Sequence, residues 1–557
     1  MNRPLRSNLK PGTALWAARR AQWRALGIGD ADMAKPKIAV VNSSSELASC
    51  FSHLDGVAAE VKRSIRAAGG LPFEVRTAAP SDFITSAGKY GAYILPARDL
   101  IAADIEVQVE GALLDGMVCL ASCDKTLPGQ VMAAGRINIP TIVVICGYQK
   151  SGSYNGEHVD IEDVFLKSGY LASGAVTLDE LGRMADAAVR GPGVCAGMGT
   201  ANSMHVVCEA LGMALPGSAP VEANSPKMFT FARASGRRIV EMVSEDLKPR
   251  DIITAGAIRN AALMVLALSG SINCVKHLQA IAVEAEVEVD VYALFSDLAD
   301  QVPLLAAVRP NGDTLIEAFD AAGGARGVMQ RLSSMLDLGA RSVAGGTIGE
   351  ALAQAPEPDG DVIHSLEAPL SRRAAINIVR GSLLPGGGIV RPGGVGERRL
   401  TFTGAAKLYH SRDEALAAIA AGQIGKGDVV ILRGLGVIGG PGMALTSAVV
   451  FALDGAGLID DVAVITEGQL SGLVNKGLVV GEASPEAAAG GPLAYVQNGD
   501  RITINVPGKA VDLHVAAEEM ERRRAGAQQK FGAQNVKGWL RTYQRTVAPV
   551  HKGAVLD

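Results

Sequence analysis

The sequence predicts an α/β protein: an N-terminal domain built on a parallel sheet, with a helical extension, followed by a barrel-like C-terminal domain rich in strands. Between residues 37 and 146, short apolar and β-branched runs alternate with segments of helical spacing. Such alternation is typical of a parallel sheet that helices cover on both faces. Beyond residue 370, short strands and turns replace it. The 557 residues also exceed what one hydrophobic core usually serves, so we expect more than one domain.

In the N-terminal half, three apolar runs are the expected strands: residues 37–42, 116–122 and 141–146. Helices are expected near residues 55–69, 99–113 and 129–136, where apolar residues recur at helical spacing. Residues 160–345 predict mostly helix, and Thr177 with Glu180 forms a capping box at the start of one helix.

The stretch QAPEPDGD at residues 354–361 marks the expected domain boundary. Beyond it, strands are expected at residues 375–381, 399–404, 428–434 and 461–468, and a hairpin over residues 493–506, where Asn498-Gly499 favours a type I′ turn. Ser411 and Glu414 form a second capping box. We therefore expect an arm over residues 1–34, an α/β domain over residues 35–360 and a β-rich, barrel-like domain over residues 370–557.

Composition favours a small-molecule substrate. A net charge of -4 with 20% charged residues offers no basic surplus for nucleic acid. No uninterrupted apolar stretch reaches the ~18 residues needed to span a membrane. The seven cysteines are odd in number and scattered, which indicates the reduced cytoplasm and not a disulfide framework.

The first 29 residues carry six basic residues and no acidic ones. This resembles an organelle transit peptide. Trp16 and Trp23 instead favour an amphipathic arm that docks on a partner subunit. We therefore expect a homodimer or a homotetramer.

Cys123, Asp124 and Lys125 end an apolar run and lead into a turn and a helix. Sulfur suits iron or zinc, whereas carboxylate oxygen suits magnesium or manganese. The carboxyl end of a strand is where α/β sheets place ligands. The three residues therefore predict a site for two unlike metals.

Cys50, Cys123 and Cys195 each follow a probable strand or turn and precede a helix, so their thiolates could meet at one edge of the sheet. By spacing alone this is weak, because isolated cysteines are commonly small buried apolar residues. That second interpretation is preferred for the remaining four: Cys119, Cys146, Cys208 and Cys274. A non-catalytic zinc module using Cys119, Cys123 and Cys146 is a further alternative, but it lacks a fourth nearby ligand.

The segment GLGVIG at residues 434–439 follows an expected strand and has Asp454 about 20 residues beyond, as a dinucleotide site would. A nicotinamide-dependent oxidoreductase is therefore an alternative function. Pro441 and Gly442 oppose a helix after the loop, and the surrounding strands look antiparallel. A loop over a substrate carboxylate, or a tight barrel corner, remains open.

Several ordered blocks resemble the dihydroxy-acid dehydratase and 6-phosphogluconate dehydratase family, which includes sugar-acid dehydratases. They are CDKTLPGQVMAAGRINIPTIVV, GVCAGMGTANSM, GSINCVKHL, GGPGM and VITEGQLSG, followed by GLVVGEASPEAAAGGPLAYVQNGDRITI. The resemblance runs from about residue 37 to residue 515. It implies a hydro-lyase that converts a 2,3-dihydroxy carboxylic acid to a 2-keto-3-deoxy acid.

The resemblance also implies site residues. Cys50, Cys123 and Cys195 would hold an iron–sulfur cluster, with [2Fe–2S] favoured over [4Fe–4S]. Asp82, Asp124 and a carbamylated Lys125 would bind Mg²⁺, and Ser471 would be the base. A carbamate requires a neutral lysine, which burial would favour by lowering the lysine pKa. Without the resemblance, Lys125 would be an ammonium group paired with Asp82 or Asp124, and Ser471 a turn hydroxyl.

One position departs from the family. After PGM the family carries Pro-Glu, with the glutamate as a magnesium ligand, and this chain has Ala444-Leu445. Leucine cannot bind a hard cation. An extra water, a substitute carboxylate such as Glu467, or a weakened site are the alternatives.

The implied chemistry explains this set of groups. One iron without a cysteine ligand would act as a Lewis acid on the C3 hydroxyl, and Mg²⁺ would stabilise enolate-like charge as Ser471 removes the C2 proton. His205 and His514 are candidate substrate contacts, although a helix-surface and a strand position respectively are preferred. The sequence leaves open whether the substrate is a branched-chain or a sugar acid.

Overall fold

Four parallel strands form the N-terminal sheet in the order β2-β1-β3-β4. They are β1 (Lys37–Asn42), β2 (Leu71–Arg76), β3 (Gly116–Ala121) and β4 (Thr141–Ile145). The structure, a computed structural model, describes residues 4–557 except 172, 374, 393–398, 441, 444, 528–530 and 532–535. Every residue of β1, β3 and β4 is buried, as expected for a sheet covered on both faces.

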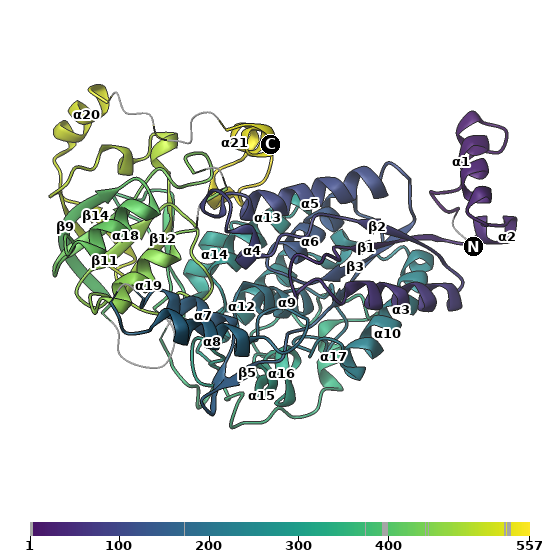
Figure 1. The fold of residues 1–557 in the computed structure, drawn as a ribbon. Helices are drawn as coiled ribbons and strands as arrows, with labels where there is room; N and C mark the ends of the chain where they lie inside the picture. Colours follow the sequence, from purple (N-terminus) through teal and green to yellow (C-terminus); the bar gives the residue numbers. More distant parts are fainter. Residues whose placement is uncertain are drawn as a thin grey trace.

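Helices α3 (Leu54–Ala67) and α10 (Pro226–Glu245) pack against each other, as do α5 (Ile94–Val109) and α6 (Thr126–Ile137). Helix α3 joins β1 to β2, whereas α5 and α6 carry the chain in the opposite direction along the sheet. Right-handed crossovers in opposite directions place their helices on opposite faces. The predicted α/β fold with a parallel sheet is thus confirmed for this half (Figure 1).

The rest of the N-terminal half is mostly helical, as predicted. A small hairpin of β5 (Gly152–Tyr154) and β6 (Glu157–Val159) precedes these helices. Thr177 caps its helix by accepting a hydrogen bond from the N–H of Glu180. The helices are α7 (Ile161–Ser168), α8 (Leu178–Ala188), α9 (Thr200–Ala210), α11 (Pro249–Ile252), α12 (Ala255–Ala267), α13 (Asn273–Glu284), α14 (Val291–Leu298), α15 (Ile316–Ala321), α16 (Gly324–Arg331) and α17 (Ile348–Ala353).

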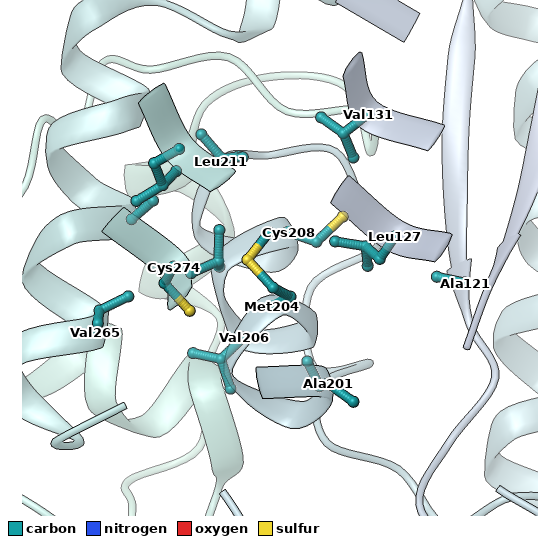
Figure 2. Packing of buried hydrophobic residues seen from close by; sticks show 14 of the residues in the cluster. Ala121, Leu127, Val131, Ala201, Met204, Val206, Cys208, Leu211, Val265 and Cys274 are labelled. Carbon is teal, nitrogen blue, oxygen red and sulfur yellow. The ribbon is translucent and has the colours of Figure 1, made fainter. Parts of the chain in front are cut away.

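Helices α6, α9, α12 and α13 meet in the core that lies behind the sheet. Cys208 and Cys274 are fully buried there among Leu127, Met204 and Leu211 (Figure 2). Cys119 and Cys146 are likewise buried in or next to strands. These four cysteines are therefore apolar core residues, as the sequence indicated.

The C-terminal half forms an eight-stranded sheet in the order β14-β13-β9-β10-β11-β12-β8-β7. Its edges nearly meet, because Arg380, just after β7, pairs with Ala510 at the start of β14. The sheet is thus barrel-like, as predicted. The strands are β7 (Asn377–Val379), β8 (Gly387–Val390), β9 (Thr401–Tyr409), β10 (Asp428–Leu432), β11 (Ala463–Thr466), β12 (Leu478–Ser484), β13 (Arg501–Asn505) and β14 (Ala510–Leu513).

Two predictions about this half were wrong. Strands β9 to β12 run parallel, not antiparallel. The expected hairpin around Asn498-Gly499 does not form, because Pro492–Tyr495 is a short 3-10 helix and β13 pairs with β14 and β9. The Asn498 side chain instead accepts a hydrogen bond from the N–H of Leu408. A local turn signal was overridden by pairing with distant strands.

Two helices connect strands of this sheet along the chain and pack against each other: α18 (Arg412–Ala420) follows β9 and α19 (Ser447–Gly455) follows β10. Two more come after the last strand, α20 (Ala517–Ala525) and α21 (Gly538–Thr546). Ser411 caps α18 by accepting a hydrogen bond from the N–H of Glu414. Within the described parts of the chain, no helix combines the length and apolarity needed to cross a membrane.

The N-terminal arm forms α1 (Ala14–Ala25) and α2 (Asp30–Met33), which stand apart from the body of the chain (Figure 1). None of the twelve residues of α1, all of them described, is buried. Trp23 packs on Phe73 of the same chain, with ring centroids 5.1 Å apart. Docking of this arm on a partner subunit stays a prediction, as does the homo-oligomer.

Candidate active site

The loops that follow β1 and β3 carry Cys50 and Cys123. The two strands are neighbours, and the helices after them lie on opposite faces of the sheet. Such a switch point leaves a crevice at the carboxyl ends of the strands. The hydroxyl of Ser122 donates a hydrogen bond to the carbonyl of Cys50 and so ties the two loops together. A hydrogen bond between the two thiols, together with burial, raises the pKa of Cys123.

Cys195 joins this pair from the loop before α9. Asn202 holds that loop, because its side-chain amide donates 2.8 Å hydrogen bonds to the carbonyls of Cys195 and Gly197. Burial raises the pKa of Cys195, and charge on Glu162 and Cys123 adds to this effect. The structure therefore brings the three sequence-predicted cysteines to one crevice.

The spacing of these sulfurs does not match a single bound ion. Among the described residues, only His158, Asp160 and Asp163 place three ligand-type atoms within 4.8 Å of one another. Cys119, Cys123 and Cys146 do not converge in this way, and burial raises the pKa of Cys119 to about 12. The geometry thus disfavours the zinc-module alternative, whereas a polynuclear cluster bridges more widely spaced thiolates.

Asp82, Asp124 and Lys125 form an ionic group beside the cysteines. Asp82 begins α4 (Asp82–Thr85), which follows β2, and the other two follow β3. The Lys125 ammonium lies 2.8 Å from Oδ1 of Asp124 and 3.4 Å from Oδ2 of Asp82. The side chain of Lys125 is fully buried.

The pKa values in this group follow from the ion pairs. Burial opposes the charge of Lys125, but Asp124 and Asp82 outweigh it and hold the pKa of Lys125 above its usual value. The lowered lysine pKa expected from burial is therefore wrong for this state of the site. Burial and the charge of Asp124 raise the pKa of Asp82. Burial also opposes the charge of Asp124, yet Lys125 holds the pKa of Asp124 below its usual value.

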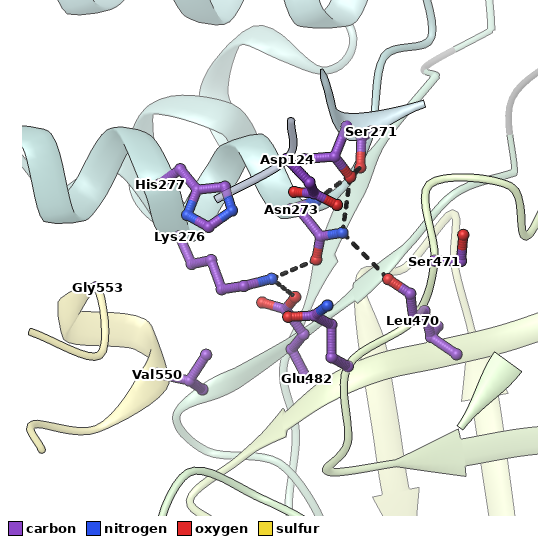
Figure 3. A network of polar contacts seen from close by, with 12 residues as sticks. Asp124, Ser271, Asn273, Lys276, His277, Leu470, Ser471, Glu482, Val550 and Gly553 are labelled. Atoms are coloured by element: carbon purple, nitrogen blue, oxygen red, sulfur yellow. Dashed lines mark hydrogen bonds and ion pairs between the residues drawn. The ribbon is translucent and has the colours of Figure 1, made fainter. Parts of the chain in front are cut away.

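Ser471 reaches the crevice from the other half of the chain, in the loop after β11. Its N–H donates a 2.6 Å hydrogen bond to the hydroxyl of Ser447, and its own Oγ accepts one of 3.2 Å from the N–H of Leu473. Asn273 on α13 fixes the preceding residue by donating 3.1 Å to the carbonyl of Leu470 (Figure 3). Ser471 thus caps a turn and faces the crevice at once.

One cavity is lined by most of these groups, whereas Cys50 and the buried side chain of Lys125 lie outside its lining. It encloses about 60 Å³ of space for water-sized groups, within an open region of about 620 Å³ that includes solvent at the mouth. The walls are mostly apolar, and the polar groups converge at one place. The lining includes Asp82, Phe83, Cys123, Asp124, Glu162, Phe165, Cys195, Thr200, Leu445, Ser471 and Leu473.

Comparison with known families matches nearly the whole length of the chain. The family model "Dihydroxy-acid/6-phosphogluconate dehydratase N-terminal" matches residues 35–351, and the corresponding C-terminal model matches residues 361–554. The chain belongs to this family. It is accordingly a dehydratase, that is, a hydro-lyase.

Individual relatives match over almost their full length. The dihydroxy-acid dehydratase of Methanococcoides burtonii is 40% identical over 554 residues, which cover 99% of each chain. Dihydroxy-acid dehydratase 1 of Methanosarcina acetivorans is 40% identical over 97% of this chain and 98% of its own. The dihydroxy-acid dehydratase of Aquifex aeolicus is 37% identical over 97% of each chain.

Leu445 lines the cavity at the position where the family resemblance implies a glutamate ligand. Its neighbour Ala444 lies outside the described residues. Glu467 does not replace the missing carboxylate. Its oxygens accept hydrogen bonds from the N–H groups of Gly434, Leu435 and Ala487, away from the described cavity lining.

The GLGVIG loop does not have the surroundings of a dehydrogenase site. The N–H groups of Ile438 and Gly439 donate to Glu486, so the chain's own carboxylates take the positions a pyrophosphate would need. Within the described residues, the next helix begins only at Ser447, and Pro441 lies outside them. The loop is a tight barrel corner, and the geometry disfavours the nicotinamide alternative.

The two histidines that were candidate substrate contacts, His205 and His514, differ in burial. His205 was expected on a helix surface, but it is fully buried and its Nε2 lies 3.1 Å from the carbonyl of Ser122, next to Cys123. Burial lowers the pKa of His205 to about 4. His514, expected within a strand, is exposed and lies one residue after the end of β14, where its Nε2 shares a hydrogen bond with the hydroxyl of Thr503.

Sequence reasoning missed Glu162, Phe83 and Phe165 as cavity residues. Glu162 is the second residue of α7, inside the capping motif Asp160-Ile-Glu-Asp163. The motif signals a helix start, but nothing in it indicates that the middle acid faces a cavity.

Proposed function

We propose that this chain is an iron–sulfur, Mg²⁺-dependent dehydratase that converts a 2,3-dihydroxy carboxylic acid to a 2-keto-3-deoxy acid. The supporting observation is one cavity lined by Cys123, Cys195, Asp82, Asp124 and Ser471, with the Cys50 thiol hydrogen-bonded to Cys123 and Lys125 paired with both aspartates. These groups come from five segments far apart in the sequence, at residues 50, 82, 123–125, 195 and 471. A free-cysteine protein of this kind would work in the reducing cytoplasm.

The residues present fit both cofactors. Cys50, Cys123 and Cys195 would hold the cluster, for which we favour [2Fe–2S]. Asp82 and Asp124 offer carboxylate oxygens to Mg²⁺, and Oδ1 of Asp82 is buried without a hydrogen-bond partner among the described residues. When bound, the cluster would supply a Lewis acid for the departing C3 hydroxyl and Mg²⁺ would supply positive charge for the substrate carboxylate.

Lys125 would take part as a carbamate, as the resemblance implies. Its ion pairs oppose this, because carbamate forms from a neutral amine and the two aspartates favour the ammonium form. A divalent cation bound by the same aspartates would remove that opposition.

Ser471 would accept the C2 proton. Its Oγ already receives a hydrogen bond from the N–H of Leu473, which favours a negatively charged oxygen. The Ser447 hydroxyl holds the backbone of Ser471 in place. Loss of the C2 proton and the C3 hydroxyl removes one water, and the resulting enol becomes the 2-keto acid.

The test uses protein purified without oxygen. Iron, sulfide and magnesium are measured, and a panel of 2,3-dihydroxy acids, both branched-chain and sugar acids, is assayed for 2-keto acid formation. We expect iron and sulfide in the protein and 2-keto acid from at least one substrate class. Protein that holds neither iron nor sulfide after reconstitution would falsify the proposal.

A further inference from the structure

Glu162 is a buried carboxyl group that the proposed mechanism does not use. It lines the cavity together with Cys123, Cys195 and Ser471, and only 6% of its surface is exposed. Its Oε1 has no hydrogen-bond partner within the described residues. A buried polar atom without a partner, on a residue that lines a cavity, marks a place where a ligand group can bind.

The local structure holds this carboxyl group in position. The N–H of Glu162 donates a 2.7 Å hydrogen bond to Asp160, the residue that caps α7. The nearby Arg309 is 2.6 Å from Asp163, to which it donates. The guanidinium of Arg309 is therefore paired with Asp163. Burial, together with the charges of Asp160 and Asp163, raises the pKa of Glu162.

The opposite side of the carboxyl group rests on the loop after Cys195. A Cβ atom on Gly197 would lie 2.2 Å from Oε2 and 2.7 Å from Oε1 of Glu162, and one on Gly199 would lie 3.2 Å from Oε1. The first two distances are shorter than any real contact. A side chain at residue 197 would displace the carboxyl group of Glu162, so this group fits closely against the backbone of the loop.

The partner that Glu162 requires is polar in either protonation state. A carboxylate needs a donor, and a protonated carboxyl group needs an acceptor for its proton. A hydroxyl group supplies both. An alkyl group placed there would exclude water and leave the carboxyl group unsatisfied, a loss greater than the gain from burying a methyl group.

We propose that Glu162 binds a hydroxyl group of the substrate beyond C3, so that the site selects polyhydroxylated sugar acids over branched-chain dihydroxy acids. The inference rests on the proposed function, in which the C2 proton and the C3 hydroxyl are already engaged in the reaction. The apolar walls at Phe83, Phe165 and Leu473 can pack against the carbon chain of a sugar acid.

The experiment compares two acids of one chain length. A pentonate carries hydroxyl groups at C4 and C5, and 2,3-dihydroxypentanoate with the same C2 and C3 configuration lacks them. Wild type should have the higher kcat/KM for the pentonate. Glu162→Leu should reduce that preference by about 10- to 150-fold, the range for one hydrogen bond to a charged group, chiefly through KM.

Glu317→Leu is the matched control. Glu317 also has a buried carboxylate oxygen without a partner in the described residues, but it does not line the cavity. Its replacement should leave the preference between the two acids unchanged. A wild type that prefers the deoxy acid, or a Glu162→Leu enzyme that loses both activities equally, overturns the inference.

Measuring the binding of both acids tests this inference independently of the proposed function. Both acids are titrated calorimetrically into iron-loaded Ser471→Ala protein with and without Glu162→Leu. If neither acid is dehydrated by wild type, the proposed function fails. Tighter pentonate binding that depends on Glu162 still supports the inference in that case, and equal or undetectable binding of the two acids contradicts it.

Discussion

Lys276 on α13 and Glu482 on β12 form a fully buried ion pair between the α/β half and the barrel. The ammonium nitrogen lies 2.5 Å from Oε1 of Glu482, and both side chains are 0% exposed (Figure 3). Lys276 also donates to the side-chain oxygen of Asn273. Asn273 holds the carbonyl of Leu470, so the pair supports the loop that carries Ser471.

Breaking this pair should destabilise the protein strongly. Lys276→Met leaves Glu482 charged, buried and without its cation, a change that costs about 3–5 kcal/mol. The double variant Lys276→Met with Glu482→Leu should recover most of the loss, because no unpaired charge remains. Urea unfolding midpoints of the two variants and wild type provide the measurement.

An exposed pair is the control for this prediction. Lys426, whose side chain is 82% exposed, lies 3.3 Å from Asp461. Lys426→Met should change stability by less than about 1 kcal/mol. A Lys276→Met protein as stable as the Lys426→Met protein would show that the buried charges are solvated or neutral.

Replacement of Cys123 should remove the cluster, whereas replacement of Cys119, four residues away, should not. Cys123→Ser should lose iron, sulfide and the visible absorption of the cluster, because it removes one of three thiolates at the crevice. Cys119→Ala, a change within β3, should retain them. Iron analysis and absorption spectra of both proteins are the measurement, and equal iron loss in the two would argue against the cysteine assignment.

Ser471→Ala should keep the cluster and stop turnover. Removing a general base typically costs 10² to 10⁴ in rate. The cluster absorption should match that of wild type, since Ser471 is not among the proposed cluster ligands. Full activity of the variant in the 2-keto acid assay would rule out Ser471 as the base.

Stability should fall as the solution is acidified, in part because of His205. Burial lowers the folded-state pKa of His205 to about 4, and the unfolded value is about 6.5. Between these values the unfolded chain binds more protons, so stability rises with pH and this contribution is lost as pH falls. The loss amounts to ~3 kcal/mol at most.

His205→Gln isolates this contribution. Glutamine keeps a donor for the carbonyl of Ser122 but does not titrate, so melting temperatures at pH 7 and pH 4.5 should differ less than in wild type. The exposed His514→Gln variant should retain the wild-type profile. A His205→Gln protein with an unchanged pH dependence would exclude a buried neutral histidine.

Local sequence patterns predicted the elements better than their pairing. The apolar runs from residue 37 to 146 predicted strands and helices that the structure contains, because such runs can only be buried between two layers. Asn498-Gly499 failed as a hairpin signal, since the partners of β13 lie elsewhere in the chain. GLGVIG matched the dinucleotide-binding motif, but that motif indicates a binding site only when a helix follows it and its backbone N–H groups are free to bind phosphate.

The sequence by itself determined the layered α/β and barrel-like fold class, the family, and which cysteines belong to the core. The fold class and the core cysteines follow from residue type and periodicity, which are local, and the family follows from the resemblance of several ordered sequence blocks. Only the tertiary structure decided that Cys50 contacts Cys123, that Cys123, Cys195, Ser471 and Glu162 line one cavity, and that Asp82 and Asp124 flank Lys125. Those outcomes depend on distances and charges between segments that are remote along the chain, and no local pattern encodes them.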